Sequence, residues 1–183
     1  FRRKIFVIKY GGSILEDAVI RSNVLQDIVF LSHVGIRTIL VHGGGPHISS
    51  RLKEKGVQAV FHDGIRVTDK DTLEVVIEEL EKLNRRIVDE IKSLQGDVTG
   101  LKGHENIIHV EKKKASRELG FVGTIKNIEK DAIGKHLQQG HITVICPLGI
   151  SGEQQPHNGN ADEVASAIAG SLTSPRSMAT SSS

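Results

Sequence analysis

Short apolar runs alternate along this chain with longer stretches in which apolar residues recur at every third or fourth position. An apolar run of four to six residues that ends at glycine or proline is typical of a buried strand, and the longer spacing is typical of an amphipathic helix. We therefore predict strands over residues 5–10, 38–42, 98–101 and 142–146. We predict helices over residues 17–33, 46–55, 68–94, 128–139 and 161–172.

The longest predicted helix opens at Thr68, which together with Asp71 resembles a capping box. Its apolar stripe continues to Leu94, and Gly96 ends it. After the next strand, residues 107–125 contain two apolar runs around a basic stretch, with two glycines near the return. This pattern predicts a hairpin.

Strands alternate with helices through most of the chain, which favours an α/β fold around a mainly parallel sheet. Residues 1–172 are enough for one domain of this kind. Residues 173–183 are rich in serine and threonine and have no apolar period, so we expect a disordered tail there.

Composition narrows the classes of function. Hydrophobic residues make up 38% and charged residues 25% of the 183 positions, which is an ordinary globular balance. With 3% aromatic residues and a net charge of +2, the chain has neither the aromatic side chains nor the basic surface of a nucleic-acid binder. Its apolar runs are too short for a membrane span. The nine histidines lack metal-binding spacing, so we assign no metal ligand. Cys146 stands alone in an apolar run and is predicted to be a buried thiol.

Three polar or glycine-rich turns each follow a predicted strand. They contain Lys9, Gly11 and Gly12, then His42, Gly43, Gly44 and Gly45, and finally Asn158, Asn160 and Asp162. In open α/β sheets, ligands bind beyond the carboxyl ends of the strands, so we expect the three turns to converge on one site.

Glycine lets the backbone approach an anion closely and offer its N–H groups, and a helix that begins at Pro46 would add its positive end. Each glycine turn taken alone also reads as a plain corner between a strand and a helix. Neither turn matches a P-loop or a dinucleotide fingerprint.

Three charged residues are candidates for chemistry. Lys9 ends an apolar strand, where its charge could neutralise a moving phosphoryl group or simply reach solvent. Arg66 could grip a carboxylate with its planar fork or lie on the surface. Asp162 could belong to the site, or its charge could simply interact favourably with the positive end of its helix dipole.

Five motifs occur in an order that resembles the N-acetylglutamate kinases of the amino acid kinase family. They are Lys9-Tyr10-Gly11-Gly12-Ser13, Val41-His42-Gly43-Gly44-Gly45-Pro46, Gly64-Ile65-Arg66-Val67-Thr68-Asp69, Gly120-Phe121-Val122-Gly123 and Asn158-Gly159-Asn160-Ala161-Asp162. The resemblance covers residues 4–172. It implies a three-layer α/β/α sandwich. It also implies that the γ-phosphoryl group of ATP, bound with Mg²⁺, is transferred to the side-chain carboxylate of N-acetyl-L-glutamate. This reaction is a step of arginine biosynthesis.

The resemblance also implies roles for individual residues. Lys9 would stabilise the transition state, and Asp162 would orient it. Phosphate contacts would come from Gly11, Gly12 and Gly43, and substrate contacts from Gly44, Gly45, Arg66, Asn158 and Asn160. The hairpin at residues 112–123 would cover the substrate. Residues 68–94 would pair two subunits in a homodimer. The protein would lie in the cytoplasm or, if a targeting segment precedes Phe1, in an organelle.

Some features depart from the family pattern. No nucleotide loop or second catalytic lysine follows Leu172, so we expect very low turnover from this chain and an unpaired strand at the edge of its sheet. His157 and Gly159 stand where the family has larger apolar or aromatic residues. Two alternatives stay open, namely an arginine-binding regulatory domain of an N-acetylglutamate synthase and a related kinase of the aminoadipate type.

Overall fold

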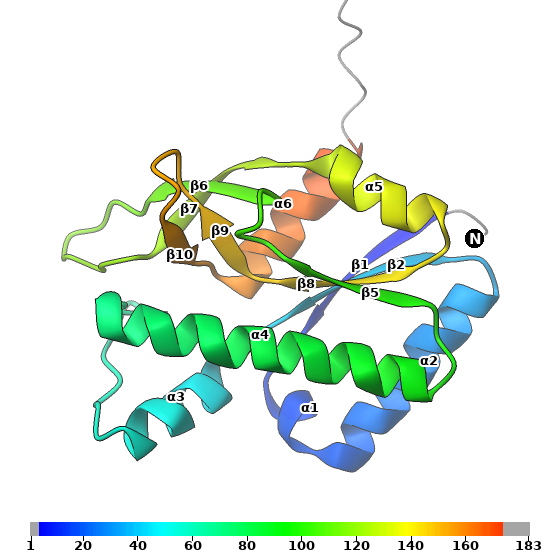
Figure 1. Ribbon diagram of the computed structural model, residues 1–183, viewed down its shortest axis with the longest axis horizontal. Helices are drawn as coiled ribbons and strands as arrows, with labels where there is room; N and C mark the ends of the chain where they lie inside the picture. Colours follow the sequence, from blue (N-terminus) through cyan, green and yellow to red (C-terminus); the bar gives the residue numbers. More distant parts are fainter. Residues whose placement is uncertain (1–3, 174–183) are drawn as a thin grey trace, which may run out of the picture.

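A parallel sheet of four strands forms the centre of the molecule. The computed structural model describes residues 4–173, and its strands lie in the spatial order β1-β2-β8-β5 (Figure 1). The four strands are β1 (Ile5–Tyr10), β2 (Arg37–His42), β5 (Val98–Lys102) and β8 (Ile142–Cys146). All four were predicted, and all run in the same direction. Their carboxyl ends therefore meet at one edge of the sheet.

Helices cover both faces of this sheet, which confirms the three-layer α/β/α architecture. The helices α2 (Ala18–His33) and α4 (Lys70–Ser93) lie on one face, and α5 (Lys130–Gln138) and α6 (Ala161–Thr173) lie on the other (Figure 1). Successive strand residues point to opposite faces. Accordingly, Leu40 packs in the cluster with α2 and α4, whereas Ile39 and Val41 pack with α5 and α6.

The N-cap of α4 lies one residue later than predicted. Asp69 caps the helix, because its carboxylate accepts a hydrogen bond from the Thr72 N–H at 2.8 Å. Thr68 is buried and extended, and its hydroxyl donates to the Arg66 carbonyl at 2.9 Å. The capping box expected at Thr68 is therefore wrong.

A second sheet of strand order β10-β9-β6-β7 lies beside the first. It contains β6 (Ile108–Lys112), β7 (Gly123–Ile128), β9 (Leu148–Ile150) and β10 (Pro156–Asn158). The antiparallel pairing of β6 with β7 confirms the predicted hairpin. The helix expected from Ile128 begins instead at Lys130, because Ile128 still pairs with Ile108. The strands β9 and β10 and the small pair β3 (Phe61–His62) and β4 (Ile65–Arg66) were not predicted.

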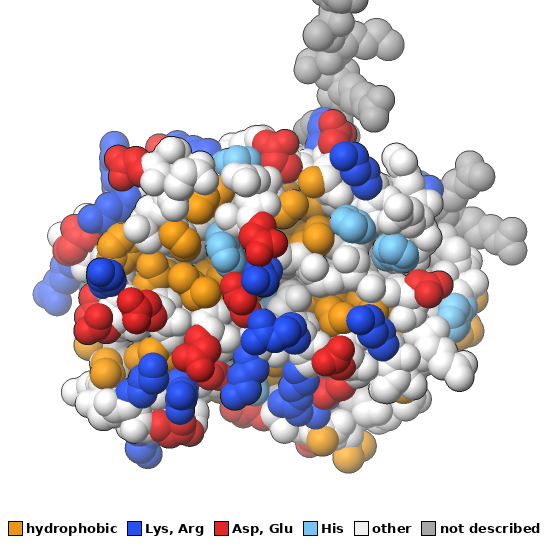
Figure 2. Space-filling model, viewed as in Figure 1, with side chains coloured by type: hydrophobic (Ala, Val, Ile, Leu, Met, Phe, Trp, Pro, Cys, Tyr) orange, Lys and Arg blue, Asp and Glu red, His pale blue; other side chains and the backbone are white. Residues whose placement is uncertain are grey.

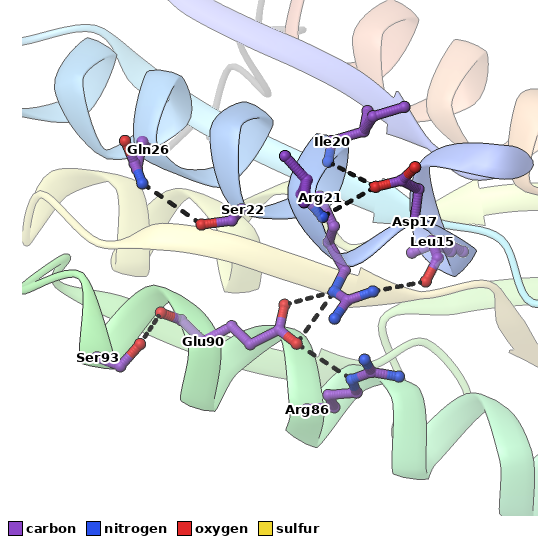
Figure 3. A network of polar contacts seen from close by, with 10 residues as sticks. Leu15, Asp17, Ile20, Arg21, Ser22, Gln26, Arg86, Glu90 and Ser93 are labelled. Carbon is purple, nitrogen blue, oxygen red and sulfur yellow. Dashed lines mark hydrogen bonds and ion pairs between the residues drawn. The ribbon is translucent and has the colours of Figure 1, made fainter.

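A partly buried ion pair joins α2 to α4 (Figure 3). Arg21 is 7% exposed, and its Nε lies 2.9 Å and 3.1 Å from the two carboxylate oxygens of Glu90. Its Nη1 also donates to the Leu15 carbonyl at 2.9 Å, just after the short helix α1 (Ser13–Glu16) begins. The guanidinium thus ties the turn after β1 to the helical layer.

The surface along α4 carries charges of both signs side by side (Figure 2). Such pairs include Arg85 with Glu81 at 3.5 Å, and exposed pairs of this kind contribute at most about 0.5 kcal/mol each. No helix among the described residues is both long enough and apolar enough to cross a membrane. Cys146 is buried, as predicted.

The ends of the described chain bear on two further expectations. Thr173 closes α6, whereas residues 174–183 of the expected disordered tail lie outside the described residues. Within residues 4–173, β1 and β5 each pair on one side only, so the central sheet has two open edges.

Candidate functional site

A cavity of about 280 Å³ opens at the carboxyl edge of the central sheet. This volume is close to the lower end of the roughly 300–1,000 Å³ that is usual for small-molecule sites. Every candidate residue from the sequence lines it, namely Lys9, Gly11, Gly12, Gly43, Gly44, Gly45, Arg66, Asn158, Asn160 and Asp162. The three turns therefore converge on one cavity, as expected.

The first two glycine turns are in contact. The Gly43 N–H donates to the Tyr10 carbonyl at 2.7 Å, which continues the β1–β2 pairing beyond the strands. A Cβ placed on Gly11 would lie 3.5 Å from the Lys9 ammonium and 3.6 Å from the Gly43 nitrogen. The absence of side chains therefore lets the lysine and both turns share one small space.

The second turn leads into α3 (Gly45–Glu54), which carries proline in its first turn, close to the predicted start at Pro46. Among residues 4–173, the N–H groups of Gly44 and Gly45 donate to no protein acceptor. Gly44 and Gly45 line the cavity at a helix N-terminus, where the partial positive charge favours an anion.

Two cations approach the cavity opposite carboxylates of α6. The Lys9 ammonium lies 3.5 Å from Asp162, and the Lys113 ammonium lies 2.8 Å from Glu163. The side chains of Lys9 and Asp162 are 40% and 69% exposed, so their mutual attraction is screened by water. Lys113 follows β6 directly, within the hairpin at residues 112–123 that the sequence predicts over the substrate, although no role was predicted for Lys113 itself.

Asn160 caps α6. Its side-chain oxygen accepts from the N–H of Asp162 at 2.8 Å and of Glu163 at 3.1 Å. This capping fixes the first turn of the helix and, with it, the carboxylate that faces Lys9. The Asn160 side chain thus has a structural task in addition to lining the cavity.

Arg66 is the most constrained charge in the site. It is 6% exposed, and its Nη2 donates to the Gly45 carbonyl at 3.1 Å and to the Ser49 hydroxyl at 2.8 Å. The guanidinium carbon lies 4.6 Å from the ring centre of Phe61. Its Nη1 is buried without a hydrogen-bond partner among the described residues, and burial lowers the pKa of the guanidinium. An arginine in a cavity wall is suited to binding an incoming carboxylate through its planar guanidinium.

Three extended segments bring the separate motifs together. The Thr68 N–H donates to the Leu119 carbonyl at 2.9 Å, and the Phe121 N–H donates back to the Thr68 carbonyl at 2.6 Å. The Asn158 N–H donates in turn to the Phe121 carbonyl at 2.9 Å. The Arg66 segment and the Asn158 segment are therefore held side by side through the segment at residues 119–121.

The third turn reaches the site by a different route from the one expected. It follows β10 and not β8, but the Gly159 N–H donates to the Pro147 carbonyl at 3.0 Å, which returns the chain to the end of β8. A Cβ on Gly159 would lie 2.7 Å from that carbonyl oxygen, so glycine suits this close approach. His157 is buried against the edge of Phe121, with 5.9 Å between ring centres.

Sequence reasoning missed three contributors to the site. Phe61 stacks on the Arg66 guanidinium from a two-residue strand, Ser49 anchors it from α3, and Lys113 comes from the end of β6. Only spatial pairing reveals them, although the apolar Val60-Phe61 pair before the Gly64 turn was a signal for β3. Among the described residues, no group of three or more His, Cys, Asp or Glu residues could hold a metal ion.

Comparison with known proteins places this chain in a family. Residues 4–178 match the family model described as the amino acid kinase family. The acetylglutamate kinase of Desulforamulus reducens is 42% identical over 175 residues, which is 94% of this chain and 61% of that protein. The acetylglutamate kinase of Syntrophomonas wolfei is also 42% identical, over 91% of this chain and 58% of that protein. The chain thus spans about three fifths of the length of these curated relatives.

A solved structure shares the fold. The smu.665 protein of Streptococcus mutans UA159 superimposes with a TM-score of 0.83 at 28% identity, over 92% of this chain and 68% of that one. By its sequence match and by its fold, this chain belongs to the amino acid kinase family.

Proposed function

We propose that this chain is the substrate-binding part of an acetylglutamate kinase, which transfers the γ-phosphoryl group of ATP to the side-chain carboxylate of N-acetyl-L-glutamate. Arg66, a buried arginine that lines the cavity, carries this proposal. A carboxylate is the ligand that such a fork binds best. The name shared by relatives at about 40% identity supports the same choice.

The transfer requires little covalent chemistry from the protein. A carboxylate oxygen of the substrate attacks the γ-phosphorus, the bond from that phosphorus to the β,γ-bridging oxygen breaks, and ADP leaves with the electron pair. Catalysis then rests on orientation and on stabilising the charge of the phosphoryl oxygens. ATP, as the Mg²⁺ complex, is the proposed donor, and it brings the metal bound to its phosphates.

In this proposal each wall of the cavity has one task. Arg66 and Asn158 hold the α-carboxylate and the acetamido end, while the N–H groups of Gly44 and Gly45 face the reacting carboxylate. Lys9 and the turn at Gly11 and Gly12 face the transferring phosphoryl group. The Lys9 ammonium stands 3.5 Å from Asp162, which can hold it in place for that purpose.

Two alternatives make different predictions. A regulatory domain of an N-acetylglutamate synthase would bind arginine, and it would have little use for the pair formed by Lys9 and Asp162. A kinase of the aminoadipate type would prefer an acceptor that is one methylene longer, and a hydrophobic pocket discriminates such a difference by only about 10- to 200-fold.

Calorimetric titration of this chain with N-acetyl-L-glutamate, its aminoadipate homologue and L-arginine distinguishes the three. We expect N-acetyl-L-glutamate to bind most tightly. Tighter binding of arginine would favour the regulatory reading, and tighter binding of the homologue would favour the aminoadipate reading. In the full-length protein, Lys9→Ala should lower the rate constant for phosphoryl transfer to N-acetyl-L-glutamate, because the ammonium acts mainly in the transition state. An unchanged rate constant would remove Lys9 from the mechanism.

We also propose that the protein forms a homodimer through the side of the molecule where α4 and the open edge of β5 lie. Strands with one open edge pair readily with a second chain. Sedimentation of the chain over a range of concentrations tests this, and a monomer at all concentrations would contradict it.

A further inference from the structure

His42 ends β2 and is completely buried beneath the second glycine turn. Its Nδ1 lies 2.9 Å from the carbonyl oxygen of Gly43. Because a carbonyl oxygen can only accept, Nδ1 carries the ring proton in this contact.

Asn84 of α4 defines the other side of the ring. Its amide nitrogen lies 3.2 Å from the Val144 carbonyl oxygen and 3.2 Å from the His42 Nε2. The Val144 carbonyl can only accept, so it fixes the NH₂ end of the amide on this side, and the second amide hydrogen meets Nε2. Nε2 is therefore an acceptor, and His42 is a neutral imidazole in a single tautomer. Burial lowers the pKa of His42 to about 4, which keeps the ring neutral near pH 7.

The contact with the Gly43 carbonyl has a consequence for the next N–H group. The Gly43 carbonyl and the Gly44 N–H belong to one peptide unit, and all described peptide bonds are trans. In a trans peptide these two groups point in opposite directions. A carbonyl held toward the buried ring therefore turns the Gly44 N–H away from it, at a residue that lines the cavity.

The space for this arrangement comes from β5. A Cβ on Gly100 would collide with the Asn84 side-chain oxygen and would lie 3.0 Å from Val88 Cγ2. The missing side chain at Gly100 lets the Asn84 amide approach the strand this closely. Residues from β2, β5, β8 and α4 thus support one peptide plane in the second glycine turn.

We propose that His42, held by Asn84, is a positioning residue that aims the Gly44 N–H group at an oxyanion bound in the cavity. The identity of that oxyanion as the carboxylate of N-acetyl-L-glutamate rests on the proposed function. The orientation of the N–H group does not, because it follows from contacts within the ligand-free protein.

Nuclear magnetic resonance of the ligand-free chain tests the orientation directly. The ¹⁵N shifts of the imidazole should show the proton on Nδ1, and a proton on Nε2 would overturn the proposal without any variant. Residual dipolar couplings report the direction of the Gly44 N–H vector. We expect His42→Leu to change this coupling and His42→Asn, whose amide nitrogen can replace Nδ1, to preserve it. An unchanged coupling in His42→Leu would refute the positioning role.

Ligand affinity supplies a second, separable measurement. A hydrogen bond to a charged group contributes about 1.5–3 kcal/mol, so a misdirected N–H should weaken N-acetyl-L-glutamate binding by about 10- to 150-fold in His42→Leu. His42→Asn should stay within about threefold of the wild type. Equal weakening in both variants, with the same thermal unfolding temperature, would count against the proposal. A wild-type chain that binds no N-acetyl-L-glutamate would refute the proposed substrate, whereas the coupling experiment would still decide the role of His42.

Discussion

Replacement of Arg66 by methionine tests the site at its most constrained charge. Methionine keeps much of the apolar stem and can still pack on Phe61, which lies 4.6 Å from the guanidinium carbon. The variant loses two Nη2 hydrogen bonds, at 2.8 Å and 3.1 Å, and it also loses the buried Nη1 that has no partner. Removal of this unpartnered donor offsets part of the loss, so we expect the ligand-free chain to lose only about 1 kcal/mol of stability.

Binding should suffer more than folding. The fork would make charge-assisted hydrogen bonds to the substrate carboxylate, and their loss costs about 2 kcal/mol, or about 30-fold in dissociation constant. At a ligand concentration of about 100 times the wild-type dissociation constant, N-acetyl-L-glutamate stabilises the wild type by about 2.7 kcal/mol. The same concentration stabilises the variant by only about 0.9 kcal/mol.

Thermal unfolding with and without ligand measures this difference. For a chain of this length, 1 kcal/mol corresponds to about 2–4 °C, so the ligand should raise the melting temperature of the wild type by about 5–11 °C and that of Arg66→Met by about 2–4 °C. Arg51→Met is the matched control, because Arg51 lies on α3 near the site but is 38% exposed and does not line the cavity. Equal ligand-induced shifts in wild type and Arg66→Met would refute the assignment of Arg66 to the ligand.

Three further predictions concern stability. Gly44→Ala should cost about 1–3 kcal/mol, because its Cβ would lie 2.6 Å from the buried Leu80 Cδ2, and chemical denaturation should show a loss that Leu80→Val partly restores. Burial lowers the pKa of His42 in the folded chain to about 4, below the usual value of about 6.5 for histidine, so the unfolded chain takes up the proton first as the pH falls. Relative to His42→Asn, the wild type should therefore lose about 3 kcal/mol of its free energy of unfolding between pH 6.5 and 4, with no relative change above pH 6.5. Parallel plots of unfolding free energy against pH for the two proteins would contradict this. Arg21→Met should cost about 1–3 kcal/mol, because it removes the donor to the Leu15 carbonyl and leaves the half-buried Glu90 paired with Arg86 alone. A change below about 0.5 kcal/mol by denaturant titration, as for a surface pair, would contradict a structural role.

The central sheet and most helices could be predicted because their signals are local. Each strand is a short apolar run that stops at glycine or proline, and each long helix has an apolar stripe. The glycine turns could also be predicted, since they stand directly after those strands. Their meeting at one cavity then follows from the parallel direction of the strands alone.

Of the second sheet, only the β6–β7 hairpin could be predicted, because β9 and β10 depend on partners that are not adjacent hairpin strands with a clear pattern of their own. Residues 142–150 form one mostly apolar run around Pro147, yet β8 belongs to the central sheet and β9 pairs with β10 and β6. Thr68 and Asp69 are both good helix caps in isolation. The choice between them is made by Leu119 and Phe121, which pair with the backbone of Thr68 and hold it extended.

The same pairing explains why Gly120 matters to a cavity that it does not line. Its φ of +71° lies in the left-handed region, and a Cβ there would collide with the Thr68 carbonyl oxygen, which is the acceptor for the Phe121 N–H. Without that contact, Thr68 would be free to join the helix, and the Arg66 carbonyl that receives its hydroxyl would lose its anchor. The position of the buried guanidinium therefore depends on a glycine 54 residues later in the sequence. Motifs that are separate along the chain act as one site only after folding, because contacts of this kind hold them together.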